Sequence, residues 1–186
     1  MEASEILKYH FRYAVISATK YTNIRSQLCR LVALAFSISE PMIEHIPQSN
    51  EEAIHLLDSM LDSVCKICPK KDKKIYDAGQ IFFDDIIIKR LVDALNILPA
   101  LKRQVIVLHD IELMSNKQIA ELYSYPVGEV CMLVHYIRAE LASLYAQLWP
   151  FAREDDIKGM CENLLLIREY IDERFVADAI MEMDEE

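Results

Sequence analysis

Glycine and proline are scarce in this sequence, and long apolar runs are absent. Three glycines and six prolines in 186 residues leave little material for loops, which favours an all-helical protein with one or two small cores. Apolar runs such as Val130–Val134 and Leu164–Ile167 are far too short to cross a bilayer. The first residues also lack the basic start and apolar core of a signal peptide, so we expect a soluble, cytoplasmic protein without membrane contact.

The five cysteines do not form a recognisable framework. Their odd number and their scatter through apolar positions are typical of reduced, buried thiols. Cys65 and Cys68 have the spacing of a metal or redox pair, but no second pair follows them. His55 lies ten residues earlier, on a different part of its expected helix. We therefore expect structural thiols at these positions, and no metal or cofactor.

Catalytic signatures are also missing. The five histidines lie apart in the sequence, and none has a nucleophile or carboxylate at a recognisable motif spacing. No glycine-rich phosphate loop occurs. His109 and Asp110 stand where we expect a helix to end. A small helical enzyme is therefore the least supported class, and we expect neither catalytic residues nor a small-molecule substrate.

Negative charge is concentrated at one end of the chain. The net charge is −10, and residues 150–186 contribute −8 of it through twelve acidic and four basic residues. Such a segment would repel nucleic acid or compete for a basic surface, although a simple solvated terminus has the same composition.

Helical periodicity and the residues that interrupt it divide the chain into four parts. An N-terminal helical domain is expected over residues 1–65, and a charged linker over 66–80. A second helical domain is expected over 81–149, followed by an acidic C-terminal helix and tail over 150–186.

Within the first domain, we expect helices over residues 6–19 and 24–36, with Pro41 and Pro47 breaking the chain. A third helix should begin at Ser49 or Asn50 and present one apolar stripe, formed by Ile54, Leu57, Leu61 and Val64.

The second domain contains the most informative segment, residues 98–141. Leu98–Pro99 should end one helix and begin another, because proline fits the first turn of a helix but not its interior. Ser115 and Gln118 have the spacing of a capping box, which predicts a short helix. Tyr123–Pro126 should then form a tight turn into a longer helix. The buried stripe expected on that longer helix consists of Val130, Val134, Ile137, Leu141, Leu144 and Leu148.

This segment resembles region four, the promoter-binding domain, of extracytoplasmic-function sigma factors. The residues that carry the resemblance are Leu98, Pro99, Arg103, Val105–Leu108, Ser115, Ile119–Leu122, Pro126–Gly128 and Val130. The resemblance implies a sigma-factor-like fold, with two small helical domains and a helix-turn-helix in the second. It also implies that the helix after Pro126 would enter the major groove of DNA.

The outward face of that helix does not have the composition expected for DNA binding. A DNA-reading surface should be basic, yet residues 115–141 carry a net charge of −1. We therefore assign the outward residues to a protein partner, and these are Glu129, Met132, Leu133 and Tyr136. Two alternatives stay open. Met132 and Leu133 can pack against another part of the chain, such as the C-terminal helix, or Lys117, His135 and Arg138 can retain some DNA contact.

The N-terminal half matches sigma factors only weakly. Region two of a sigma factor normally has an acidic turn before the helix that binds polymerase, whereas the comparable segment here, residues 22–28, contains no acid. The loss is similar to that in the sigma-like domain of general stress response regulators, which sequesters an anti-sigma protein. These resemblances imply a sigma mimic, an adaptor or an assembly factor of a larger complex. The partner would be an anti-sigma-like protein, polymerase or a larger complex. The alternative is a functional sigma factor or DNA-binding regulator.

Overall fold

The structure is a computed structural model that describes residues 3–43, 50–67, 81–151 and 154–184. Within these ranges the chain is helical, apart from turns and one isolated antiparallel bridge between Ile24 and Ile81. The expected all-α class is therefore confirmed. None of the helices in these ranges combines the length and the apolar composition needed to cross a membrane.

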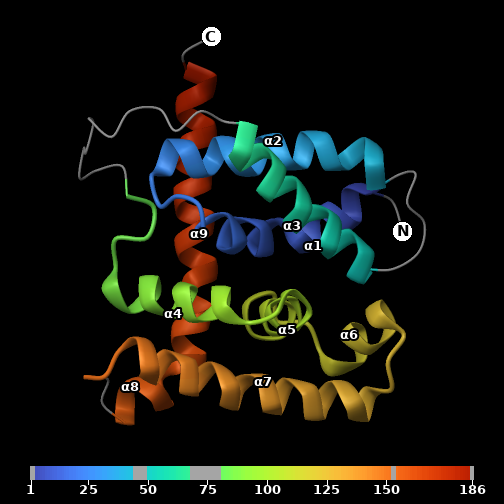
Figure 1. The fold of residues 1–186 in the computed structure, drawn as a ribbon, viewed down its shortest axis with the longest axis vertical. Helices are drawn as coiled ribbons and strands as arrows, with labels where there is room; N and C mark the ends of the chain where they lie inside the picture. Colours follow the sequence, from blue (N-terminus) through green and yellow to red (C-terminus); the bar gives the residue numbers. More distant parts are fainter. Residues whose placement is uncertain (1–2, 44–49, 68–80, 152–153, 185–186) are drawn as a thin grey trace.

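Three helices form the upper layer in Figure 1: α1 (Ala3–Ala18), α2 (Arg25–Ile43) and α3 (Asn50–Ile67). The apolar stripe predicted for α3 is buried in full. The predicted end of the second helix at residue 36 was wrong, because α2 continues to Ile43 and Pro41 lies in its last turn. Two residues follow the proline before the helix ends, so Pro41 does not mark the boundary of α2. Pro47 lies outside the described residues.

The middle layer consists of α4 (Ile86–Ile97) and α5 (Ala100–Ile106), which continues into a π-helical turn, η2 (Val107–Ile111). The carboxylate of Asp85 accepts hydrogen bonds from the amides of Ile87 and Ile88 and so caps α4. Leu98 and Pro99 lie between α4 and α5, where the sequence predicted one helix to end and the next to begin.

The lower part of the molecule is formed by α6 (Asn116–Tyr123), α7 (Val127–Leu148) and α8 (Glu154–Lys158). The last helix, α9 (Met160–Asp184), crosses behind the other layers in Figure 1. It contacts α4, η2, α1 and α8. Among its described side chains, Met160, Leu164, Ile167 and Ile171 are buried. The C-terminal helix thus ties the upper layer to the lower helices.

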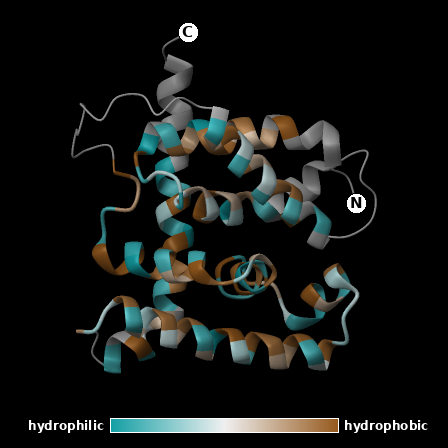
Figure 2. Cartoon of the chain, viewed as in Figure 1, coloured by the Kyte–Doolittle hydropathy of each residue, from teal (hydrophilic) through white to brown (hydrophobic). Residues whose placement is uncertain are grey.

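A single hydrophobic core runs through these layers. Buried residues of α1–α3, of α4–η2, of α6–α7 and of α9 belong to one connected cluster. Along helices such as α7, Figure 2 shows hydrophobic and hydrophilic residues alternating, as expected where one side of a helix faces a core. The predicted linker begins inside α3, which extends to Ile67, and the remainder of that linker, residues 68–80, lies outside the described residues.

The short segment before α4 packs against the turn between α1 and α2. Phe82 and Phe83 are buried, and the Phe82 amide donates to the Asn23 carbonyl oxygen over 2.8 Å. The Asn23 side chain also bonds to both backbone polar groups of Phe83. From α9, Tyr170 stacks on Phe83 with a centroid distance of 5.4 Å. The segment 22–28, where the sequence lacks the expected acids, comprises the end of this turn and the start of α2, and its turn is engaged in internal packing.

A buried arginine connects the upper and middle layers. Arg103 on α5 is 1% exposed, and its guanidinium donates over 3.0 Å both to the Tyr13 hydroxyl on α1 and to the Asp58 carboxylate on α3. The same guanidinium lies 5.0 Å from the centre of the Tyr13 ring. Burial is the largest cause of a raised pKa for Tyr13, so this hydroxyl stays protonated. This network fixes α1, α3 and α5 relative to one another.

Candidate functional site

The turn between α6 and α7 forms as the sequence predicted. The Ser115 hydroxyl accepts from the Gln118 amide over 3.3 Å, and the Gln118 side chain accepts from the Ser115 amide over 2.9 Å, which completes the capping box. Ser124 ends α6 in the left-handed region with φ 56°. The residues before and after it, Tyr123 and Tyr125, stack on each other with ring centres 6.0 Å apart. These local contacts fix the direction in which α7 begins.

One side of α7 is held in the core. Val130, Val134, Ile137 and Leu141 are buried, as predicted. The prediction fails at the end of the helix, where Tyr145 is buried and Leu144 and Leu148 are half-buried. Tyr145 follows Leu141 by four residues, which keeps it on the same face, and its ring packs edge-on against Trp149 with centres 5.8 Å apart. This anchorage leaves the opposite side of α7 outside the core.

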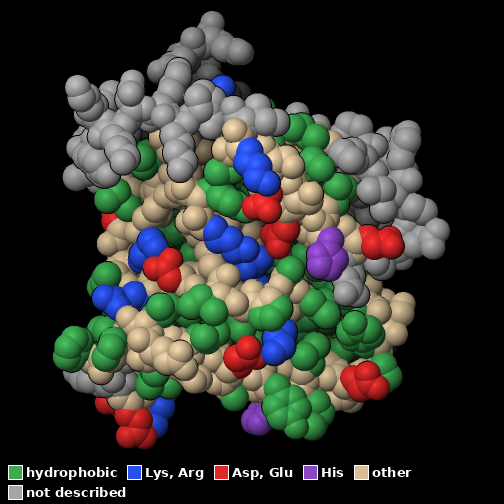
Figure 3. Space-filling model, viewed as in Figure 1, with side chains coloured by type: hydrophobic (Ala, Val, Ile, Leu, Met, Phe, Trp, Pro, Cys, Tyr) green, Lys and Arg blue, Asp and Glu red, His purple; other side chains and the backbone are tan. Residues whose placement is uncertain are grey.

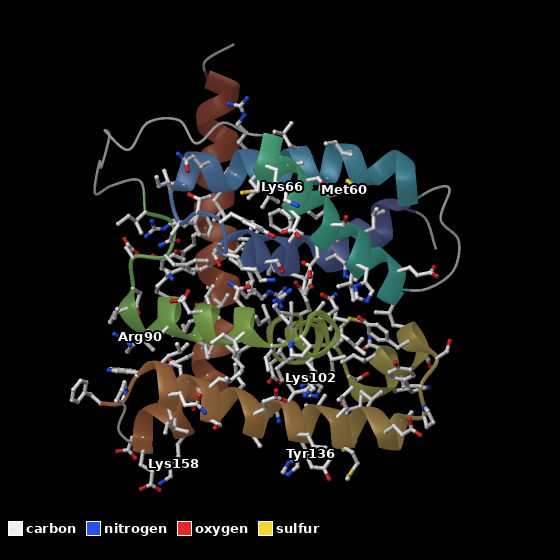
Figure 4. All side chains as sticks on the ribbon, viewed as in Figure 1. Met60, Lys66, Arg90, Lys102, Tyr136 and Lys158 are labelled. Carbon is white, nitrogen blue, oxygen red and sulfur yellow. The ribbon has the colours of Figure 1, made fainter. Side chains whose placement is uncertain are left out.

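The outward side of α7 carries exposed apolar residues near its N-terminal end. Val127, Met132 and Tyr136 are 48%, 54% and 60% exposed. Figure 4 shows Tyr136 pointing away from the body of the protein. Figure 3 shows hydrophobic side chains gathered at the lower right, over α6 and the first half of α7. A surface helix normally turns polar residues toward solvent, and neighbouring exposed apolar residues often mark a binding surface. This side of α7 is therefore a candidate binding surface.

The four residues assigned to a protein partner do not share one environment. Glu129, Met132 and Tyr136 are exposed, whereas Leu133 is half-buried and packs against the core. Leu133 therefore packs on the core side of α7, and the exposed surface is formed by the other three residues. The exposed thiol of Cys131 joins them, which contradicts the expectation that the cysteines are buried.

The alternative in which Met132 and Leu133 pack against another part of the chain holds for Leu133, which packs against the core, but not for Met132, which is exposed. The described elements in main contact with α9 are α4, η2, α1 and α8. Met132 stays more than half exposed, which a covering helix would prevent. The outward side of α7 is accordingly open in the described part of the chain.

The basic residues assigned to the alternative of DNA binding lie beside carboxylates. Arg138 pairs with Asp110 of η2, and Lys117 lies 3.9 Å from Glu121 one turn further along α6. These are the only lysine and arginine residues in the sequences of α6 and α7. Between α5 and α7, Lys102 pairs with Glu140 over 2.6 Å, and Figure 4 shows Lys102 in this position. The third residue of this alternative, His135, is exposed and contacts Tyr136 edge-on, with ring centres 6.0 Å apart.

The sequence predicted a helix end at His109 and Asp110 but not the pairing of Asp110 with α7. The carboxylate of this residue is 4% exposed and also lies 2.6 Å from Nδ1 of His109. Burial alone would raise its pKa, but the hydrogen bonds from His109 and Arg138 and their charges outweigh it and lower the pKa below the ordinary value. The π-helical turn places Asp110 toward α7, and no local pattern in the sequence predicts that turn.

The described residues offer little for metal binding. Among them, no three side chains of His, Cys, Asp or Glu lie together in a way that could hold a metal ion. Cys65 is half-buried and free, while Cys68 lies outside the described residues.

Compared with protein-family models, with curated proteins and with solved structures, the chain shows no match.

Proposed function

We propose that this protein is a non-catalytic, sigma-like protein whose helix-turn-helix binds a protein partner instead of promoter DNA. In this proposal, α6 and α7 are the two helices of that motif, and Glu129, Met132 and Tyr136 form the contact surface. The protein would act as a sigma mimic, an adaptor or an assembly factor. The resemblance of residues 98–141 to region four supports the scaffold, and the exposed face of α7 supports its changed use.

The observation that carries this proposal is the combination of charge pairing and exposed apolar surface on α7. Phosphate contacts by free lysine and arginine residues supply much of the affinity of DNA-binding proteins. Arg138 already pairs with a buried carboxylate, and Met132 and Tyr136 occupy the face that would meet the groove. Methionine and tyrosine are enriched in protein interfaces, where a few large side chains carry most of the binding energy.

The second candidate is a functional sigma factor or DNA-binding regulator. Lys117 favours it, because its side chain is 78% exposed and its contact with Glu121 is long enough to break easily. One such residue supplies too little charge for strong binding to DNA.

Capture of partners by the tagged full-length protein tests the proposal. We expect wild-type protein to retain a protein partner, with anti-sigma-like proteins and polymerase subunits as named candidates, and Met132→Lys to lose it. The matched control is Ile97→Lys. Ile97 is 53% exposed, as Met132 is 54% exposed, but it lies at the end of α4 and outside the proposed contact surface. Equal retention of the partner by Met132→Lys and wild type would contradict the assignment of the surface.

A further inference from the structure

The outward side of α7 forms one continuous uncharged stripe, which we call the α7 stripe. Its members are all exposed, and they are Gly128, Cys131, Met132, His135, Tyr136, Ala139 and Ser143. Their spacing follows one face of a helix over about four turns, or roughly 22 Å at the ordinary rise of a helix. Lysine, arginine and carboxylate residues make up 27% of the whole chain, so their absence from this stripe is a local property of α7.

The sizes of the side chains along the α7 stripe suit a second helix. Met132 and Tyr136 stand one turn apart near the middle and provide two adjacent anchors. Gly128 precedes them, and Ala139 and Ser143 follow them, so small residues flank the anchors at both ends. Small residues allow close approach of a second helix, while the large pair can insert between its side chains. A long, narrow, straight stripe matches the apolar face of an amphipathic helix better than it matches a flat surface.

The charges beside the α7 stripe indicate which sign of charge the partner should carry. The charged residues of α7 are Glu129, Arg138 and Glu140. Arg138 and Glu140 pair with Asp110 and Lys102, whereas Glu129 has no ion-pair partner among the described residues. An unpaired carboxylate at the border of an uncharged stripe favours a basic residue on the partner and disfavours acidic surfaces. Phosphate groups of DNA and of anionic lipid headgroups are disfavoured for the same reason.

From these observations we infer that the α7 stripe binds an amphipathic helix of a partner protein, with an apolar face of about four turns and a lysine or arginine opposite Glu129. The apolar residues of that helix would contact Met132 and Tyr136, and its basic residue would form an ion pair with Glu129 at the border. This inference rests on the proposed function and narrows it to one class of ligand.

A displayed library of helical peptides tests the inference without knowledge of the natural partner. Sixteen-residue helices would carry randomised positions on one face and at its two borders, and selection would use the full-length protein. We expect the selected helices to combine apolar residues at i, i+3, i+4 and i+7 with lysine or arginine at the border. Synthetic peptides from the selection are then measured against Met132→Lys, Glu129→Gln, Glu129→Lys and the control Ile97→Lys.

Met132→Lys should weaken binding of these peptides at least tenfold, because a charged side chain replaces an apolar anchor. Glu129→Gln should weaken it several-fold and Glu129→Lys more strongly, with both effects reduced at high salt. Ile97→Lys should leave binding unchanged.

Three results would overturn the inference. If selected peptides depend on Met132 but carry acidic or neutral borders, the class of ligand is wrong while the proposed contact surface stands. If they bind Met132→Lys as well as wild type, both the inference and the proposed surface are wrong. If selection enriches no helix above the unselected library, the α7 stripe is not a helix-binding surface, and capture of the natural partner then decides the proposed function separately.

Discussion

The guanidinium of Arg138 on α7 holds the buried carboxylate of Asp110 on η2. Its Nε donates to Oδ2 over 2.9 Å, and Nη2 donates to Oδ1. The arrangement is bidentate, which is the strongest geometry for an arginine and a carboxylate. It links the turn at the end of α5 to the helix that carries the exposed face. It also pairs the only arginine in the sequence of α7, whose side chain is 40% exposed, with a buried carboxylate, and this bears on every function proposed for that helix.

The Asp110–Arg138 pair should make the stability of the protein depend on pH in the acidic range. The pKa of Asp110 is lower in the folded protein than in the unfolded chain, so the folded state favours the ionised form. Its contribution is therefore complete above the unfolded pKa of about 4 and is lost as the pH falls toward the folded pKa. Urea unfolding between pH 7 and pH 2.5 should show a shallower loss of stability for Asp110→Asn. Identical pH profiles for this variant and wild type would count against the pairing.

Leu113→Gly should stabilise the protein. Leu113 has φ 60° and is 61% exposed, and it lies where the amide of Met114 closes the helix by donating to the Leu108 carbonyl oxygen. Glycine is favoured at this left-handed position, and an exposed leucine contributes little packing, so we expect a gain of about 0.5–1 kcal/mol. Ser124→Gly, at φ 56°, should behave similarly. Thermal melting measures both variants, and a lower melting temperature for Leu113→Gly would show that its side chain packs internally.

Two neighbouring residues on α7 should respond differently to lysine. Leu133→Lys should cost about 1–3 kcal/mol, because Leu133 is half-buried and packs against the core. Met132→Lys should change the free energy of unfolding by less than about 0.5 kcal/mol, because Met132 is 54% exposed. Denaturant unfolding of both variants provides the comparison. A large loss of stability for Met132→Lys would mean that its side chain belongs to the core, and the assigned contact surface would be withdrawn.

Loss of Asp58 should weaken the junction between the upper and middle layers. Asp58→Ala removes the carboxylate that faces the buried guanidinium of Arg103, and a buried charge without its partner is unfavourable. We expect the free energy of unfolding to fall by roughly 2–3 kcal/mol. This is toward the low end for such pairs, because the Asp58 side chain is 26% exposed. Asp62→Ala is the control, since Asp62 bonds to the exposed Tyr21 and should cost less than about 1 kcal/mol. Equal losses for the two variants would contradict the importance of Arg103.

Local patterns in the sequence predicted the secondary structure around α6 and α7 well. The capping box of Ser115 and Gln118 and the helix boundary at Leu98–Pro99 depend on residues a few positions apart, so they can be recognised without a structure. Burial of Val130, Val134, Ile137 and Leu141 follows from their helical spacing in the same way.

Contacts between distant segments could not be predicted in this way. Asp110 and Arg138 are 28 positions apart, and their pairing depends on a π-helical turn that has no sequence signature. Leu144 and Tyr145 both fit the helical spacing after Leu141, so periodicity does not choose between them, and Tyr145 is the residue that packs against Trp149. The partial burial of Leu133 also depends on tertiary packing. A leucine can occupy either an exposed contact or a core position, so the residue type alone does not predict which one it takes.

The affinity of the full-length protein for duplex DNA decides whether α6 and α7 serve promoter DNA or a protein partner. Fluorescence anisotropy with labelled duplexes at low salt, beside an acidic control protein of similar size, measures this affinity and its salt dependence. We predict binding no tighter than that of the control, because Arg138 is paired and Lys117 is the one other lysine or arginine in the sequences of α6 and α7. Micromolar or tighter binding that falls steeply with added salt would contradict the account and would make a DNA-binding regulator the better description.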